Sequence, residues 1–335
     1  MTNELSRREM LMGGTALVVG GAASPATGGS SAASSEPAPP LRIQRREADV
    51  SSRENRFLFG LNTSTIRGQK LSIIEEIAIA EKAGYQALEP WIDELERYAA
   101  SGGSLEDLGK RFRDARLSVE SAIGFFEWIV DDPARRRKGL ESARRSMDLV
   151  RRIGGKRLAA PPVGATDRPI TDLLKIAERY RVLLEMGDEL GVVPQLEVWG
   201  SSKTLGRLGE AALVAIEARH PKACILADVY HLYRGGSGFE GIKLLGGGSI
   251  HVFHFNDYPA NPPREKATDA DRVFPGDGVA PLKTLLRDLA ANGLRVTLSL
   301  ELFNRKYWSQ DPLTVARTGL EKMKALFHGE PGGPP

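Results

Sequence analysis

Eight short apolar runs alternate with amphipathic helical stretches from Phe57 onward, and this alternation constrains the fold more than any other feature. We expect strands over residues 57–62, 86–90, 117–123, 157–161, 192–198, 223–228, 249–255 and 295–302. Helices are expected over 73–83, 134–153, 171–190, 205–218, 281–292 and 312–327, several ending at Gly84, Gly154, Gly191 and Gly293. This pattern predicts an α/β fold, a closed parallel (β/α)8 barrel. The first run is not followed by a G-x-G-x-x-G motif, which argues against a dinucleotide-binding sheet.

The first 55 residues differ in composition from the rest, which divides the chain into segments 1–55 and 56–330. Ser6-Arg7-Arg8-Glu9-Met10-Leu11 precedes an apolar run to about Ala23 and then a Ser/Ala/Pro-rich stretch. This order resembles a twin-arginine export signal with a flexible linker, and it predicts a periplasmic protein. The alternative is an ordinary disordered N-terminus with an incidental arginine pair. The apolar run is shorter than the roughly 20 residues of a membrane span.

A single acidic residue, Glu301, stands near the end of the last apolar run. Alternation places Leu298, Leu300 and Leu302 on one face of this strand and Glu301 on the other. Because an unpaired buried carboxylate is costly, either a metal ion or a basic residue must face Glu301.

Polar residues also stand near the ends of the three preceding strands. Glu197 follows Leu196, Asp228 ends its strand and precedes His231 by three residues, and His254 shares the parity of Val252. In a parallel barrel the carboxyl ends of the strands carry the reacting groups, so these side chains should converge. Three carboxylates and one imidazole suit one divalent ion, Mn²⁺, Co²⁺, Mg²⁺ or Zn²⁺. For each residue alone, a salt bridge or helix cap is the alternative role.

Five segments together resemble the xylose isomerase-like barrel superfamily, which contains sugar isomerases and epimerases as well as endonuclease IV. They are Leu196-Glu197-Val198, Asp228-Val229-Tyr230-His231, His254-Phe255-Asn256-Asp257, Arg272-Val273-Phe274-Pro275-Gly276-Asp277-Gly278, and Glu301-Leu302-Phe303-Asn304 with Tyr307-Trp308. The resemblance covers about residues 57–327 and is nearest to the keto-inositol (inosose) isomerase branch.

The resemblance implies a role for each matching residue. Glu197, Asp228, His254 and Glu301 would bind the metal, and the two glutamates would also act as the catalytic acid/base pair. His231 and Arg272 match substrate-binding residues of the superfamily. Two further candidates come from position alone: Glu89 could bind a sugar hydroxyl or form a structural salt bridge, and Trp199 could line the sugar site or pack in the core.

These expectations favour a metal-dependent isomerase or epimerase that moves a proton of a ketose or cyclic keto-polyol through an enediolate. A lyase or dehydratase acting on a keto-sugar or keto-glycoside is the main alternative. Endonuclease IV-like DNA repair is disfavoured by the small number of histidines, five in all, and nucleic acid is not expected as a partner. A non-catalytic sugar-binding barrel is the fourth reading. The sequence leaves open the sugar, its phosphorylation and whether the chain forms a homo-oligomer.

Overall fold

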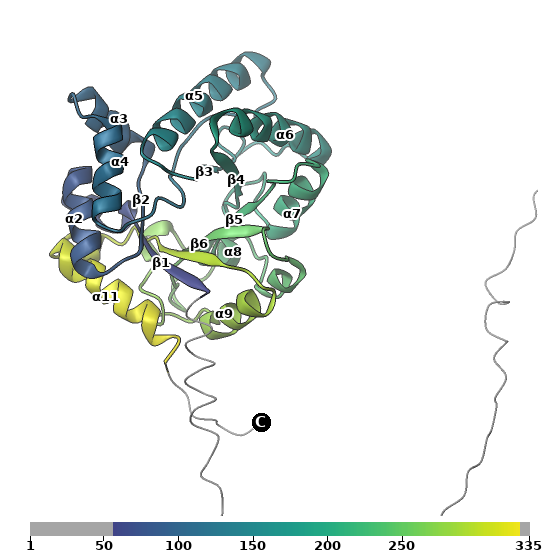
Figure 1. Cartoon of the computed structure of the whole chain (residues 1–335). Helices are drawn as coiled ribbons and strands as arrows, with labels where there is room; N and C mark the ends of the chain where they lie inside the picture. The colour runs from purple at the N-terminus through teal and green to yellow at the C-terminus, as the bar shows by residue number, and fades with distance from the viewer. Residues whose placement is uncertain (1–55, 329–335) are drawn as a thin grey trace, which may run out of the picture. The chain divides into compact units, whose positions relative to one another are not determined.

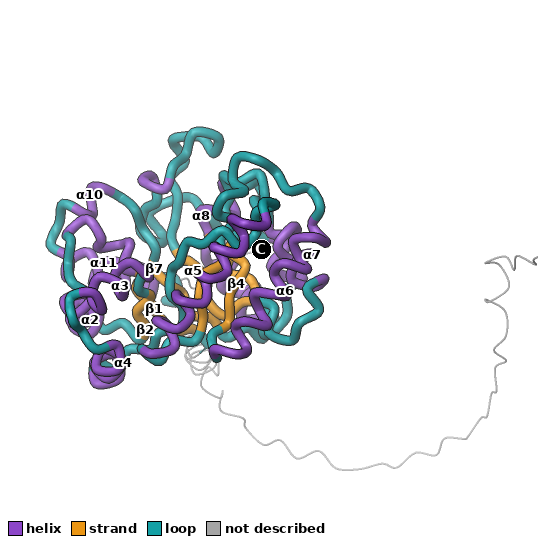
Figure 2. The backbone as a smooth tube through the Cα atoms, turned by 90° about the horizontal axis from the view of Figure 1, so that it is seen from above, coloured by secondary structure: helices purple, strands orange, loops and turns teal. Residues whose placement is uncertain are grey.

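The computed structural model describes residues 56–328, so the predicted export signal and linker in residues 1–55 lie outside the described residues and stay a prediction. Seven parallel strands form one curled sheet in the order β2-β1-β7-β6-β5-β4-β3. Helices surround the strands in Figure 1, and the view turned by 90° in Figure 2 shows the strands enclosed by them. The strands are β1 (Phe57–Asn62), β2 (Ala87–Glu89), β3 (Arg157–Ala160), β4 (Val193–Glu197), β5 (Ile225–Asp228), β6 (Ile250–Phe255) and β7 (Val296–Leu300).

The segment expected as the third strand, residues 117–123, closes the barrel without forming a regular strand. It makes two isolated parallel bridges, Ala87 with Ser118 and Trp91 with Ile123, and its backbone also bonds to β3 through Ala122. Pro90 lies between the two bridges and has no N–H to donate, which interrupts the ladder with β2. The prediction of eight regular strands was therefore wrong by one, while the (β/α)8 barrel is confirmed.

The six helices expected from the sequence are present, with boundaries shifted by one to three residues at most of their ends, and the described residues hold four further helices that had no predicted range. Together they are α2 (Ile73–Ala83), α3 (Ile92–Ala100), α4 (Leu105–Asp114), α5 (Pro133–Arg152), α6 (Leu173–Leu190), α7 (Leu208–Glu217), α8 (Val229–Arg234), α9 (Leu282–Ala291), α10 (Arg305–Trp308) and α11 (Pro312–Ala325). The four without a predicted range are α3, α4, α8 and α10. The four glycines expected after helices all have positive φ, between 71° and 92°. Glycine adopts this left-handed conformation without a steric penalty, so each one ends its helix and turns the chain back.

Two layers of apolar side chains hold the barrel. The larger lies between the strands and the surrounding helices and includes Leu298 and Leu300 of β7. The smaller comprises Ile123, Ala159, Leu226 and Val252. Since Val252 and His254 alternate with outward-facing residues on β6, this smaller group lies on the same side of the sheet as His254. Within residues 56–328 the structure has no helix with both the length and the apolar character needed to cross a membrane.

Candidate active site

Strand register brings the predicted site residues to one end of the barrel. Asp228 on β5 lies opposite His254 on β6, which in turn lies opposite Ser299 on β7. Glu301 follows β7 directly, and Glu197 is the last residue of β4. Parallel strands end at the same edge of the sheet, so side chains distant in sequence meet there.

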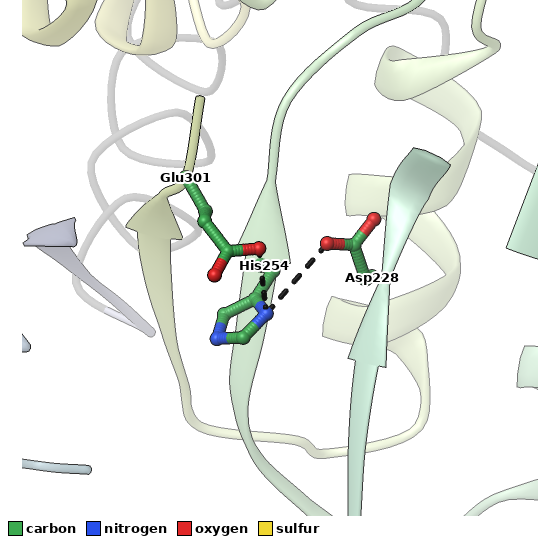
Figure 3. Close-up of side chains that lie close together, drawn as sticks. All are labelled: Asp228, His254 and Glu301. Carbon is green, nitrogen blue, oxygen red and sulfur yellow. Dashed lines mark ion pairs between the residues drawn. The ribbon is translucent and has the colours of Figure 1, made fainter. Parts of the chain in front are cut away.

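The imidazole of His254 lies at the centre of these acids. Its Nδ1 is 3.1 Å from Glu301 Oε2, 3.6 Å from Asp228 Oδ2 and 3.8 Å from Glu197 Oε1. Figure 3 shows the Glu301 and Asp228 carboxylates on either side of the ring, both directed at this nitrogen. All four side chains are buried, and within the described chain neither His254 Nδ1 nor Glu197 Oε2 makes a hydrogen bond of good geometry.

The opposite edge of the His254 ring meets a fourth carboxylate. His254 Nε2 is 3.2 Å from Glu89 Oε2, and that oxygen also accepts bonds from Asn62 Nδ2 at 2.9 Å and Ser299 Oγ at 2.6 Å. Glu89 therefore belongs to the same group of residues. We call Glu89, Glu197, Asp228, His254, Arg272 and Glu301 the polar cluster.

Arg272 is the principal basic residue of the polar cluster, with a side chain only 1% exposed. Its Nη1 donates to Asp228 Oδ2 at 2.7 Å and to Glu301 Oε2 at 2.8 Å. Nε and Nη2 both donate to Asp269, and Nη2 also contacts His231 Nε2 at 3.2 Å. These five contacts match the five N–H groups of a guanidinium. Either a metal ion or a basic residue was expected to face Glu301, and Arg272 is a basic residue that does so.

The acids and bases shift each other's protonation. Burial raises the pKa of Asp228, but Arg272, His231 and His254 together outweigh burial and hold that pKa well below its usual range. Burial lowers the pKa of His254, but Glu301 and Glu89 outweigh it and raise that pKa well above 6.5. Burial also raises the pKa of Glu197 to about 8, although His254 opposes this. The polar cluster thus contains both firmly ionised and readily protonated carboxylates.

His231 is a neutral ring in this arrangement. Burial lowers its pKa to about 4. Because an arginine can only donate, His231 Nε2 must accept from Arg272, which assigns the proton to Nδ1. In the part of the chain that the structure describes, Nδ1 is buried and has no hydrogen-bond partner. This N–H remains able to donate to a bound molecule.

A row of aromatic rings follows the strand ends near the polar cluster. The centroids are 6.1 Å apart for Phe303 and Trp91, 5.2 Å for Trp91 and Phe125, 6.1 Å for Phe125 and Trp199, and 6.5 Å for Trp199 and His231. We call these five residues the aromatic rim. Phe125 is 48% exposed, and its contacts with Trp91 and Trp199 within the aromatic rim mark it as a candidate ligand contact.

The donor set fits a divalent cation. Asp228, His254 and Glu301 each offer one ligand atom, and these atoms all lie within 4.8 Å of one another. Three acids surrounding an imidazole nitrogen that makes no well-formed hydrogen bond leave negative charge for a cation to balance. Glu197 lies at the edge of this set and could complete it.

The family model for xylose isomerase-like TIM barrels matches residues 77–326. The chain belongs to this family. It is 26% identical over 258 residues to inosose isomerase of Bacillus velezensis, covering 75% of this chain and 91% of that protein. It is also 26% identical over 266 residues to 3-dehydroshikimate dehydratase of Pseudomonas aeruginosa, covering 75% of this chain but 39% of that protein. The crystal structure of the IolI protein with a bound zinc atom has the same fold, with a TM-score of 0.74, 22% identity and coverage of 81% and 98%.

All seven residues predicted for the site lie in or beside the polar cluster: Glu89, Glu197, Asp228, His231, His254, Arg272 and Glu301. Their individual roles stay predictions. Sequence reasoning missed Asn62, Asp269 and Phe125. Asn62 carried a detectable signal, since it is a polar residue at the end of a strand, whereas Phe125 lies in an apolar run and carried none.

Proposed function

We propose that this protein is a divalent-metal-dependent isomerase or epimerase of a ketose or cyclic keto-polyol. The observation that carries the proposal is the His254 Nδ1 atom facing oxygens of Glu301, Asp228 and Glu197 at 3.1, 3.6 and 3.8 Å. Membership of the xylose isomerase-like family and similarity to an inosose isomerase support it. The substrate is expected to be unphosphorylated, because no glycine-rich phosphate loop follows the last two strands.

Asp228, His254, Glu301 and Glu197 would hold the metal, which we expect to be Mn²⁺, Co²⁺, Mg²⁺ or Zn²⁺. A bound divalent ion would polarise the carbonyl and adjacent hydroxyl of the sugar, so that negative charge can develop on their oxygens. Arg272 holds Asp228 and Glu301 in place through its Nη1 bonds, and its charge helps to keep Asp228 ionised.

The proton transfers are assigned to the two glutamates. One carboxylate removes the proton from the carbon beside the carbonyl, the substrate becomes an enediolate, and a carboxyl group returns a proton to a carbon. Glu197 suits this exchange because its side chain is buried and its Oε2 makes no hydrogen bond within the described residues, which leaves that oxygen free to take up a proton. His231 Nδ1 would donate to a sugar hydroxyl, and the aromatic rim would cover the apolar face of the sugar.

The test is α-proton exchange. Purified protein loaded with zinc or manganese is incubated with ketoses and inososes in D₂O and followed by NMR. We expect Glu301→Gln and Glu197→Gln to abolish exchange while the fold survives. Glu106→Gln, which alters an exposed ion pair with Arg152 and a contact with Ser104, should retain full exchange. Full activity in either of the first two variants would remove the assignment.

A lyase is the second candidate, favoured by the similarity to 3-dehydroshikimate dehydratase. The first step is the same loss of the α-proton to a carboxylate. The electron pair then forms a carbon–carbon double bond and the bond from the β-carbon to its oxygen breaks. That oxygen takes a proton from a carboxyl group, so a hydroxyl leaves as water and an alkoxy group leaves as an alcohol. NMR of the same reactions distinguishes the two candidates, since only the lyase gives an unsaturated product and free water or alcohol.

A further inference from the structure

We propose that Glu89 is a positioning residue for His254: it holds the Nε2 edge of the imidazole so that the Nδ1 edge faces the acids of the metal site. The inference rests on the metal site of the proposed function. Two roles were expected for Glu89 from its position in the sequence, a sugar contact or a structural salt bridge, and the proposed role is nearer to the second.

The contact between the two residues is buried and close. His254 is fully buried, and Glu89 is only 3% exposed. His254 Nε2 lies 3.2 Å from Glu89 Oε2 and 3.4 Å from Glu89 Oε1, so one carboxylate covers one edge of the ring. The two residues are 165 positions apart in the chain and come from β2 and β6.

Glu89 is itself held in place from two neighbouring strands. Asn62, its register partner on β1, donates to Oε2 at 2.9 Å, and Ser299 on β7 donates to the same oxygen at 2.6 Å. Ser299 is also the register partner of His254. Rotation of the Glu89 carboxylate away from His254 would break both bonds, so the ring meets a fixed acceptor.

The chemistry of imidazole turns this contact into a constraint on the other nitrogen. A neutral imidazole has one N–H and one lone pair, and an ionised carboxylate can only accept. The proton of neutral His254 therefore belongs on Nε2, and the lone pair belongs on Nδ1. Nδ1 is the atom that faces Glu301, Asp228 and Glu197. Carboxylates hold metal-binding histidines in this way in many proteins, fixing both the tautomer and the ring orientation.

Asn62 links this contact to a second acid of the site. Its Nδ2 also reaches Glu301 Oε1 at 3.3 Å, while its Oδ1 accepts from Ser64 N and Trp91 Nε1. The amide is therefore fixed by four partners. A change at Glu89 should be transmitted to Glu301 as well as to His254.

The substitution Glu89→Gln separates charge and hydrogen bonding from size. If the new NH₂ group takes the place of Oε2, it opposes the donors of Asn62 and Ser299. If it takes the place of Oε1, it faces His254 Nε2 itself, and one uncharged amide oxygen is left to accept from Asn62, Ser299 and His254. Either orientation weakens the arrangement that presents Nδ1 to a cation.

The experiment measures zinc binding without substrate, by competition with a chromophoric chelator, in the full chain. Zinc is the probe because the IolI structure of the same fold contains it. We expect Glu89→Gln to bind zinc roughly 10- to 100-fold more weakly than the wild type, the range found for such supporting carboxylates. The matched control is Glu94→Gln, which alters another buried glutamate whose partners are Thr63, Trp91 and Arg67. Its zinc affinity should equal that of the wild type.

A second measurement does not depend on the variant folding. In zinc-loaded wild-type protein labelled with ¹⁵N-histidine, His254 should carry its proton on Nε2 and bind zinc through Nδ1. A proton on Nδ1, or wild-type zinc affinity in Glu89→Gln, would overturn the inference and leave the proposed function standing. Weakened zinc binding in Glu89→Gln together with no turnover of any ketose by the wild type would support the inference and refute the proposed function. Absence of zinc binding by the wild type would overturn the inference, and absence of binding of Mn²⁺, Co²⁺ and Mg²⁺ as well would also refute the proposed function.

Discussion

Replacement of Arg272 by methionine tests the electrostatic account of the site most directly. Methionine has a similar length and is apolar, so it can remain between the rings of Tyr230 and Phe303, which lie 4.6 and 5.1 Å from the guanidinium carbon. The substitution leaves Asp228 and Glu301 buried without their partner, at exposures of 0% and 4%. Asp269 is 53% exposed and can turn to water, so the loss of its ion pair with Arg272 contributes little to the change in stability.

Removing one partner of a buried ion pair costs about 3–5 kcal/mol, because the remaining charge stays desolvated. We therefore expect Arg272→Met to lower the free energy of unfolding by about 3–5 kcal/mol at pH 7. The pKa of Asp228 is depressed in the fold. The stabilisation linked to it is therefore present above the unfolded value near 4 and is lost as the pH falls through the folded value. The difference between wild type and variant should accordingly persist at pH 7 and shrink in acid.

The assay is urea denaturation with a chelator present, followed by circular dichroism. Arg264→Met is the control, since Arg264 pairs with exposed Glu265 and is itself 46% exposed. An exposed pair of this kind contributes about 0–1 kcal/mol. A decrease of less than about 1 kcal/mol in the free energy of unfolding of Arg272→Met would show that Asp228 and Glu301 do not need Arg272 to balance their buried charge.

Two further predictions concern the substrate and pH. Phe125→Ala should raise the KM for a keto-polyol roughly three- to tenfold, the equivalent of about 0.5–1.5 kcal/mol of aromatic contact, with kcat nearly unchanged; an unchanged KM in steady-state assays would remove Phe125 from the substrate site. Without metal, stability should fall between pH 5.5 and 8. Glu197 has a raised pKa of about 8, so the fold tolerates this buried group only while it is protonated. His254 also has a raised pKa, and the stabilisation linked to its charge is present below 6.5 and is lost as the pH rises through the folded value. Urea midpoints at the two pH values, with chelator and with zinc, check this, and a chelated protein at least as stable at pH 8 as at pH 5.5 would contradict it.

Much of the fold follows from local pattern. Period-two alternation predicted that Leu298 and Leu300 face the helices while Glu301 faces the other way, and both leucines are in the larger apolar layer. The glycines after helices were predicted correctly because only their local conformation matters. The irregular pairing of residues 117–123 with the segment around Pro90 was not predicted, since a broken ladder depends on which strand lies next to the proline.

The sequence by itself determined four residues of the candidate site, because parity and position near strand ends select Glu197, Asp228, His254 and Glu301 from the strands that carry them. Only the tertiary structure decided what each of these residues meets. Arg272 reaches Asp228 and Glu301 from a loop, and Glu89 reaches His254 from β2. Periodicity fixes the face on which a side chain lies. Register and the closure of the barrel fix its neighbours across the site, and these depend on hydrogen bonds between strands far apart in the chain.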